Sequence, residues 1–317
     1  MNIKEIKDRG ATLIVSTLIT MAMLAAGSGC SIKRMAANKL GDALAGSGVT
    51  FAADDDPELI KAAAPFSLKL MESILAETPR HRGLLRAAAG GFTQYAYAFV
   101  QQEADEMEEK DIVAATEMRK RARKLYLRAR DYALRELEIA HPGFRAKLNS
   151  EPRVAVGVLN RKDVAAAYWA AASWGAATGI IKNDTGLFAD LEKVDALADR
   201  LLALDPDYDF GSIHSFMITY QMTRPKAQVE PAVLAREHFT AAVRQSHGQQ
   251  VSPYVSLAES VSVPEQNGKE FRELLNSALK VDLEARPEWR LSNLVFQRRA
   301  RWLLSREKDF IGVSEEQ

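Results

Sequence analysis

The sequence predicts an all-α protein made of stacked antiparallel helical hairpins. Ala, Leu, Arg and Glu are abundant and runs of β-branched residues are few, which favours helices over strands. One long uncharged stretch of small and aromatic residues fits a buried helix, and four prolines divide the chain into helical segments. The 317 residues are enough for one large or two ordinary domains with a real core.

The stretch from Asp163 to Ile181 is expected to be the central helix. Asp163 is a candidate N-cap and Gly179 a candidate stop, and no residue between them is charged. A helix without a polar face is buried on all sides. Trp169 and Trp174 are five residues apart and therefore point about 140° away from each other. We expect one ring in the packed core, with the other either in the core too or facing a cavity or groove.

Four prolines suggest an internal repeat. Each follows a helical run and precedes a ring by two residues: Pro79 with His81, Pro142 with Phe144, Pro206 with Tyr208, and Pro287 with Trp289. The first two spacings, 63 and 64 residues, are close to two helix–turn–helix units of about 34 residues, whereas the third is 81. Residues 56–306 are therefore expected to form a degenerate tetratricopeptide-like array, followed by a C-terminal tail over 307–317.

The N-terminus has the pattern of an export signal. Three basic residues precede an uncharged run over 11–26, which is too short for a comfortable membrane span. The run ends in small residues and the only cysteine, Cys30, and this resembles a bacterial lipobox, although Gly27 stands where leucine is usual. We expect a signal peptide over 1–29 and a lipid on Cys30. A soluble exported protein that loses Cys30, or an uncleaved anchor, are the alternatives. Ser31, the residue after Cys30, favours anchoring of this periplasmic lipoprotein in the outer membrane over anchoring in the inner membrane.

A flexible tether is expected over residues 30–55, which are rich in alanine and glycine. The first helix of the body should begin after Asp56, with Pro57 at its first position, and continue to about Ala76. A second helix is expected over residues 82–107. Its rings Phe92, Tyr95 and Phe99 share one face, which is either a core stripe or a stripe that faces a ligand.

Charge is segregated in the next segment. Glu103 to Asp111 is acidic and Arg119 to Arg130 is strongly basic, which predicts a helical hairpin with a turn near Asp111. The basic run is either a patch for a partner or a lipid headgroup, or a solvated face that pairs with the acidic run. Overall the 42 basic and 42 acidic residues balance, and an exported protein does not meet nucleic acid, so that class of partner is excluded.

The sequence contains no motif that indicates an enzyme. The five histidines lack metal-ligand spacing, there is no cysteine pair, and no nucleophile elbow is present. No cofactor, metal or catalytic residue is therefore expected. His214 fits a packed or capping residue at a helix start. Arg298, Arg299 and Arg301 could contact an anion or a partner, or could form structural ion pairs on a helix face.

Five motifs occur in a fixed order along the chain: Asp54–Leu59, Gly91–Tyr97, Tyr168–Trp169, Ser173–Gly175 and Arg298–Leu304. No single motif is diagnostic. Together with the lipobox, the ordered set resembles the T-component (TatT) family of TRAP transporters, a family of tetratricopeptide-like periplasmic lipoproteins. The resemblance covers residues 30–306.

The resemblance implies an all-helical homotrimer with an apolar passage or cleft in each protomer. It also implies a periplasmic substrate-binding subunit as partner, which delivers a hydrophobic or organic-acid solute to a permease. If such a ligand enters this chain, we expect small and aromatic side chains to line its site: Tyr95, Phe99, Tyr168, Trp169 and Trp174. The alternative function is an envelope-anchored scaffold that grips protein partners on a charged groove and holds no small ligand.

Overall fold

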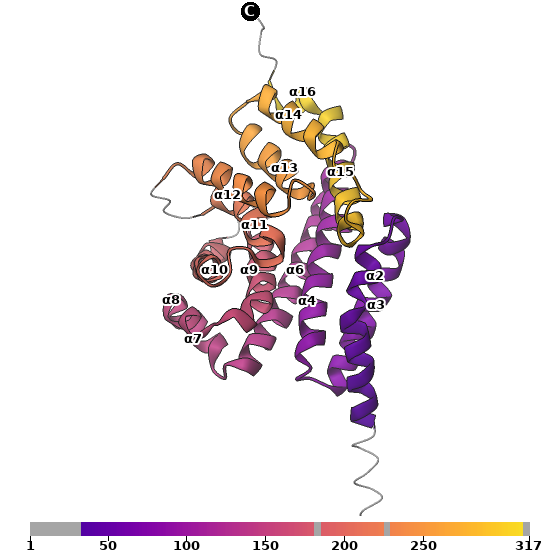
Figure 1. Ribbon diagram of the computed structural model, residues 1–317, viewed down its shortest axis with the longest axis vertical. Helices are drawn as coiled ribbons and strands as arrows, with labels where there is room; N and C mark the ends of the chain where they lie inside the picture. The colour runs from indigo at the N-terminus through magenta and orange to yellow at the C-terminus, as the bar shows by residue number, and fades with distance from the viewer. Residues whose placement is uncertain (1–32, 181–184, 225–228, 313–317) are drawn as a thin grey trace, which may run out of the picture.

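The computed structural model describes residues 33–180, 185–224 and 229–312, and all regular structure within these ranges is helical (Figure 1). The prediction of an all-α fold is thus confirmed for this part of the chain. Residues 33–46 are helical. The α-helices that follow are α2 (Gly48–Ala52), α3 (Pro57–Glu77), α4 (Arg82–Ala96), α5 (Gln102–Met107), α6 (Ile112–Ala140), α7 (Phe144–Ser150), α8 (Pro152–Ala155), α9 (Val164–Gly179), α10 (Thr185–Leu204), α11 (Ser212–Gln221), α12 (Pro231–Gln245), α13 (Ser252–Leu257), α14 (Gly268–Leu279), α15 (Arg290–Ser305) and α16 (Glu307–Phe310).

Shorter helical turns join these helices. Two are π-helical and four are 3₁₀ turns. The π turns are η1 (Tyr97–Gln101) and η5 (Ala258–Ser262), and the 3₁₀ turns are η2 (Val156–Val158), η3 (Arg161–Asp163), η4 (Tyr208–Gly211) and η6 (Pro287–Trp289).

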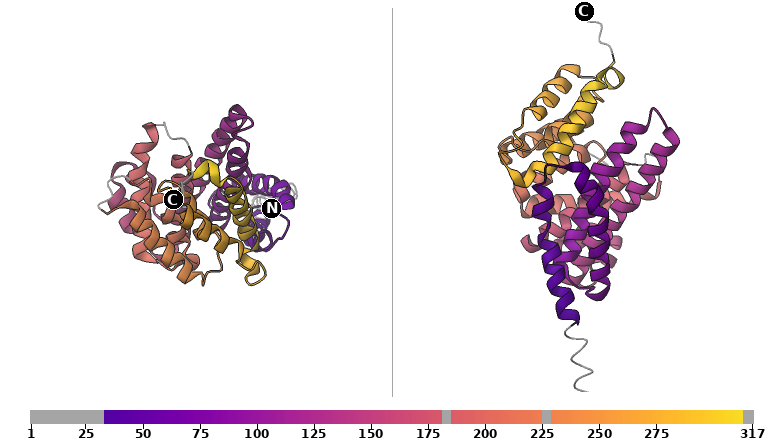
Figure 2. Two further views of the ribbon diagram at one scale, coloured as in Figure 1. Left: turned by 90° about the horizontal axis from the view of Figure 1, so that it is seen from above. Right: turned by 90° about the vertical axis from the view of Figure 1, so that its right-hand side faces the viewer.

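The longer helices mostly pack against the next long helix in the chain, with shorter helices in between. Helix α4 packs on α6, α6 on α9, α9 on α10, and α11 on α12. The C-terminal helices α14 to α16 lie at the end of the molecule opposite residues 33–46 (Figure 2). The four marker prolines lie between or at the start of helices, as expected of residues that interrupt helical hydrogen bonding. The tetratricopeptide-like repeat itself stays a prediction.

Helix α9 is the centre of the fold, as its sequence predicts. It contacts α4, α6, α10 and α11, and Gly179 is its last residue. Asp163 stands at the N-cap position, but its side chain does not cap α9. The carboxylate, only 2% exposed, instead binds His141 at 2.9 Å and the backbone and side-chain nitrogens of Asn160. Asp163 therefore pairs with His141, the residue that follows α6, and does not cap α9.

The N-terminal segment is helical and packed where a flexible tether was predicted. Ala37 and Leu44 pack into the same core as Leu84 and Phe92. The His81 ring, which caps α4 by accepting from Leu84 N at 3.1 Å, also lies 3.2 Å from Asp42. A Cβ at position 41 would lie 2.8 Å from this ring, so the glycine there permits the close approach. Residues 33–52 are thus the first layer of the helical body.

Two further predictions concern the chain ends. Part of the predicted tail over 307–317 is helix α16, and the Phe310 ring lies 5.5 Å from that of Trp302. The predicted signal peptide and Cys30, the predicted lipidation residue, lie outside the described residues and stay predictions. The described residues hold no helix that is long and apolar enough to cross a membrane.

Candidate functional site

The five rings predicted to line a ligand site lie in separate places. Tyr95 and Phe99 contact each other at 5.7 Å between ring centres, on α4 and η1. Tyr168 contacts Trp169 at 5.0 Å on α9, and also Tyr208 at 5.5 Å. Trp174 is one and a half turns further along α9. The structure therefore brings four of the five rings together in two pairs and leaves Trp174 apart from them, and the role proposed for the five as one lining stays a prediction.

Both tryptophans of α9 pack against protein atoms. The Trp174 side chain is 3% exposed, its Nε1–H donates to Asp190 Oδ2 at 3.1 Å, and the Arg130 guanidinium lies 4.9 Å from its ring centre. The Trp169 ring lies against Gly90 of α4, where an added Cβ would come within 3.0 Å of the ring. These contacts fit the core interpretation of the two rings, with Trp174 between α6 and α10 and Trp169 on α4.

The three arginines singled out near the C-terminus differ in their surroundings. Arg298 lies 2.8 Å from Glu106 and 3.6 Å from Glu58. Arg299 is 8% exposed and lies 3.1 Å from Asp105 and 2.6 Å from Glu259. Arg301 is exposed and donates to Gln297 Oε1 at 3.3 Å. Arg298 and Arg299 thus form structural ion pairs, the alternative to anion binding.

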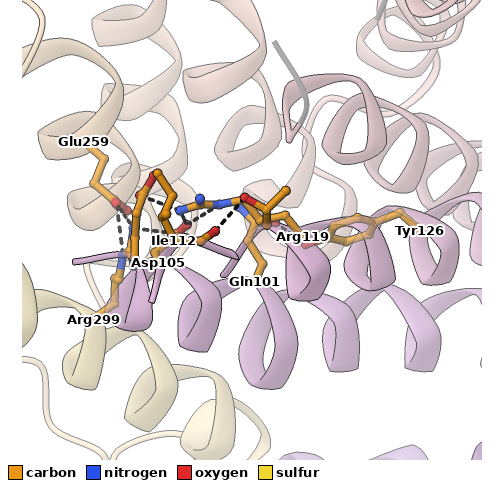
Figure 3. A network of polar contacts seen from close by, with 9 residues as sticks. Gln101, Asp105, Ile112, Arg119, Tyr126, Glu259 and Arg299 are labelled. Atoms are coloured by element: carbon orange, nitrogen blue, oxygen red, sulfur yellow. Dashed lines mark hydrogen bonds and ion pairs between the residues drawn. The ribbon is translucent and has the colours of Figure 1, made fainter. Parts of the chain in front are cut away.

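Arg299 joins the two halves of the chain in a partly buried network (Figure 3). Asp105, at the end of the α4–η1–α5 run, accepts from Arg299 of α15 and from Arg119 of α6 at 2.7 Å. Nearby, Tyr126 donates to Gln101 at 2.7 Å. Glu259, the other partner of Arg299, belongs to the π turn η5, so both π turns adjoin this network. The two partners of Arg299 are 194 and 40 residues away from it in the sequence, so Arg299 fixes the packing of distant parts of the chain.

The basic run of α6 has two uses. Arg119 turns to the acidic run and binds Asp105 and Glu108, which confirms pairing across the predicted hairpin for this residue. Lys124 and Arg128, in contrast, face a surface groove of about 520 Å³ between α6 and α7. Its lining consists of Lys124, Leu127, Arg128, Asp131, Tyr132, Arg135 and Arg145. We call this the basic groove, since four of the seven residues are cationic and one is acidic.

The three arginines of the basic groove are held in place by their neighbours. The Arg128 guanidinium lies 5.4 Å from the centre of the Phe92 ring, and Arg135 donates to the Pro79 carbonyl at 2.7 Å. Arg145 lies 3.3 Å from Asp131. Arg128 and Arg145 are nevertheless 47% and 46% exposed, which leaves their charge accessible to a partner. The groove therefore presents preorganised positive charge on a chain whose overall charge is balanced.

A histidine pair lies between α11 and α12. His214 Nδ1 and His238 Nδ1 are 2.8 Å apart, and Gln221 Nε2 is 3.2 Å from His238 Nε2. Burial, together with His214 and Arg224, lowers the pKa of His238 to about 4. Burial also lowers the pKa of His214, with Arg244 adding to and Asp207 opposing the effect. Within the described residues no group of three or more His, Cys, Asp or Glu side chains could hold a metal ion.

The histidine pair predicts a loss of stability in acid. A lowered folded-state pKa means that the unfolded chain binds more protons below pH 6.5, so stability is fully present above pH 6.5 and falls as the pH drops toward 4. We expect the pair to account for about 2 kcal/mol of this fall, allowing for partial exposure. Urea unfolding of the full-length chain at several pH values measures it. The variant His238→Asn should flatten the pH profile, whereas exposed His247→Asn should leave it unchanged; equal slopes in all three proteins would contradict the prediction.

Sequence reasoning missed several residues of these sites. Tyr132, Arg135 and Arg145 of the basic groove were not singled out, because Arg145 comes from a different helix and the other two carry no motif. His238 was not linked to His214, which lies 24 residues away on the neighbouring helix. For the basic groove, the only signal in the sequence was the basic run that ends at Arg130.

Fold and surface together define a class: an all-helical protein without a recognised catalytic arrangement in its described part, which offers a charged groove instead. Two comparisons narrow this class. The family model described as "TRAP transporter T-component" matches residues 53–311. A protein of Treponema pallidum (strain Nichols), described as uncharacterized, is 31% identical over 304 residues, which cover 89% of this chain and 93% of the relative. The chain belongs to the TRAP transporter T-component family. This is a family of accessory components of extracytoplasmic transport systems and is not a known enzyme family.

Proposed function

We propose that this chain is a non-enzymatic, lipid-anchored periplasmic component that docks the substrate-binding subunit of a TRAP-type transporter. The observation that carries the proposal is the match of the family model to residues 53–311, which cover the helices from α3 to α16. The basic groove supports docking of a protein, because an accessible row of positioned cations is complementary to a negatively charged surface on a partner. Anchoring through Cys30, with Ser31 favouring the outer membrane, and assembly as a homotrimer remain part of the proposal.

Passage of a small apolar or organic-acid solute through the interior is a second candidate. Its support is the pair Tyr168 and Trp169, which is only partly buried on α9. The packing of Trp174 and Phe99, at 3% and 5% exposure, speaks against a site shared by all five rings. Extraction of the purified full-length chain and mass spectrometry should recover a solute if this candidate is right. A solute that disappears in Trp169→Ala would support it, and repeated recovery of nothing would contradict it.

The docking proposal is tested in the cell envelope. The tagged full-length chain is cross-linked in its own cells and purified, and the TRAP substrate-binding subunit is quantified by mass spectrometry. An unrelated periplasmic binding protein of similar abundance is the control. We expect at least tenfold enrichment of the TRAP subunit over the control. Equal recovery of both proteins would contradict the proposal.

A further inference from the structure

We propose that the basic groove between α6 and α7 binds an acidic segment on the surface of a protein partner, the substrate-binding subunit. The identity of that partner rests on the proposed function, whereas the acidic chemistry rests on the groove. Four cations line the groove and Asp131 is its only acidic lining residue. The sequence as a whole is neutral, so the excess of cations is local to this groove, although Glu72 lies 3.6 Å from Arg128 and offsets part of it.

The geometry of the groove fits an extended acidic segment. Lys124 and Arg128 are one helical turn apart, or about 6 Å along α6, and Arg135 lies about 16 Å from Lys124. Side chains on one face of an extended peptide recur about every 6.7 Å. Successive carboxylates on one face of such a segment can therefore meet Lys124 and Arg128, and continue to Arg135. A single small dicarboxylate is shorter than this row of charges.

The groove also offers directional hydrogen bonding and an apolar wall. Three of its cations are arginines, whose guanidinium groups bind carboxylates with two parallel hydrogen bonds. Leu127 and the Tyr132 ring form the apolar part of the lining. The Tyr132 hydroxyl donates to Glu72 Oε1 at 2.7 Å, which fixes the ring. Because Phe92, Pro79 and Asp131 already position the arginines, binding loses less side-chain entropy than on a free surface.

Charge reversal tests the inference directly. The double variant Lys124→Glu/Arg145→Glu reverses two charges of the groove. The matched control is the double variant Lys269→Glu/Lys280→Glu, which reverses two exposed charges elsewhere, one in α14 and one directly after it. Binding of the full-length proteins to the purified substrate-binding subunit is measured at 50 and 300 mM NaCl. We expect the groove variant to bind at least tenfold more weakly, the control variant to bind as wild type, and wild-type binding to weaken at high salt. Circular dichroism and thermal unfolding check that both variants fold.

Two further binding measurements, with an acidic peptide and with lipid vesicles, separate failure of the proposed function from failure of the inference about the groove. Fluorescein-labelled deca-glutamate reports the acidic chemistry without the subunit, and should bind wild type and control but not the groove variant. If it does so while the subunit fails to bind wild type, the proposed function falls and the groove chemistry stands. If the groove variant binds both the subunit and deca-glutamate as wild type does, the inference is overturned. It is equally overturned if the groove variant loses binding only to vesicles with phosphatidylglycerol, since a membrane would then be the occupant.

Discussion

Replacing Trp174 with alanine is expected to lower the free energy of unfolding by about 4 kcal/mol, because it removes a large buried ring and leaves a cavity. Trp174 belongs to α9, and its side chain is 3% exposed and lies between α6 and α10. The substitution also removes the contact with Arg130 at 4.9 Å and the hydrogen bond to Asp190 at 3.1 Å. Urea unfolding of the full-length chain, followed by circular dichroism, measures the change.

Trp174→Phe is the matched control for this prediction. It keeps an aromatic ring in the core but removes the Nε1–H donor to Asp190, so we expect a loss of about 1–2 kcal/mol. A loss below 1 kcal/mol for Trp174→Ala would contradict the packed interpretation. It would mean that the ring faces open space and would revive the solute cavity.

The second large effect is expected at Arg299. Arg299→Met should destabilise the chain by about 3 kcal/mol, because Asp105 and Glu259 lose a buried counter-charge. Arg119 still pairs with Asp105, so Glu259 carries most of the uncompensated charge. Adding Glu259→Gln to Arg299→Met should therefore recover part of the loss. Urea unfolding of the single and double variants measures both steps.

Arg301→Met is the control for this experiment. Arg301 is exposed and contacts only the amide oxygen of Gln297 among the contacts described for it, so we expect a change within 0.5 kcal/mol. If Arg299→Met and Arg301→Met proved equal, the network in Figure 3 would not join the two halves of the chain in the way described.

The features that the sequence predicted well depend on local chemistry. Asp56 caps α3 by accepting from Glu58 N and Leu59 N, and Pro57 is its first residue, as expected. Asp111 begins α6 by accepting from Ala114 N, which sets the turn of the hairpin. In both cases the cap and its partner lie within three residues. The uncharged composition of α9 predicted burial on all sides without knowledge of its neighbours, and 8 of its 16 residues are buried.

The features that the sequence did not predict depend on distant residues. His141 draws Asp163 away from capping α9, and His81 holds the glycine- and alanine-rich segment that was expected to be a tether. The helix expected over 82–107 is present, but its π turn at Tyr97–Gln101 carries no local signal. Arg299 resembles a surface arginine until its partners on α5 and η5 are known. The basic groove needs Arg145, which only the fold brings beside Lys124 and Arg128.

A photo-cross-linker at Leu127, inside the basic groove, tests docking at this surface most directly. The full-length variant is expressed in its own cells and irradiated, and the adducts are identified by mass spectrometry. The same cross-linker at exposed Phe66 of α3 is the control position. We predict an adduct with the TRAP substrate-binding subunit from Leu127 and little or none from Phe66. An adduct with this subunit from Phe66 but none from Leu127 would contradict docking in the groove.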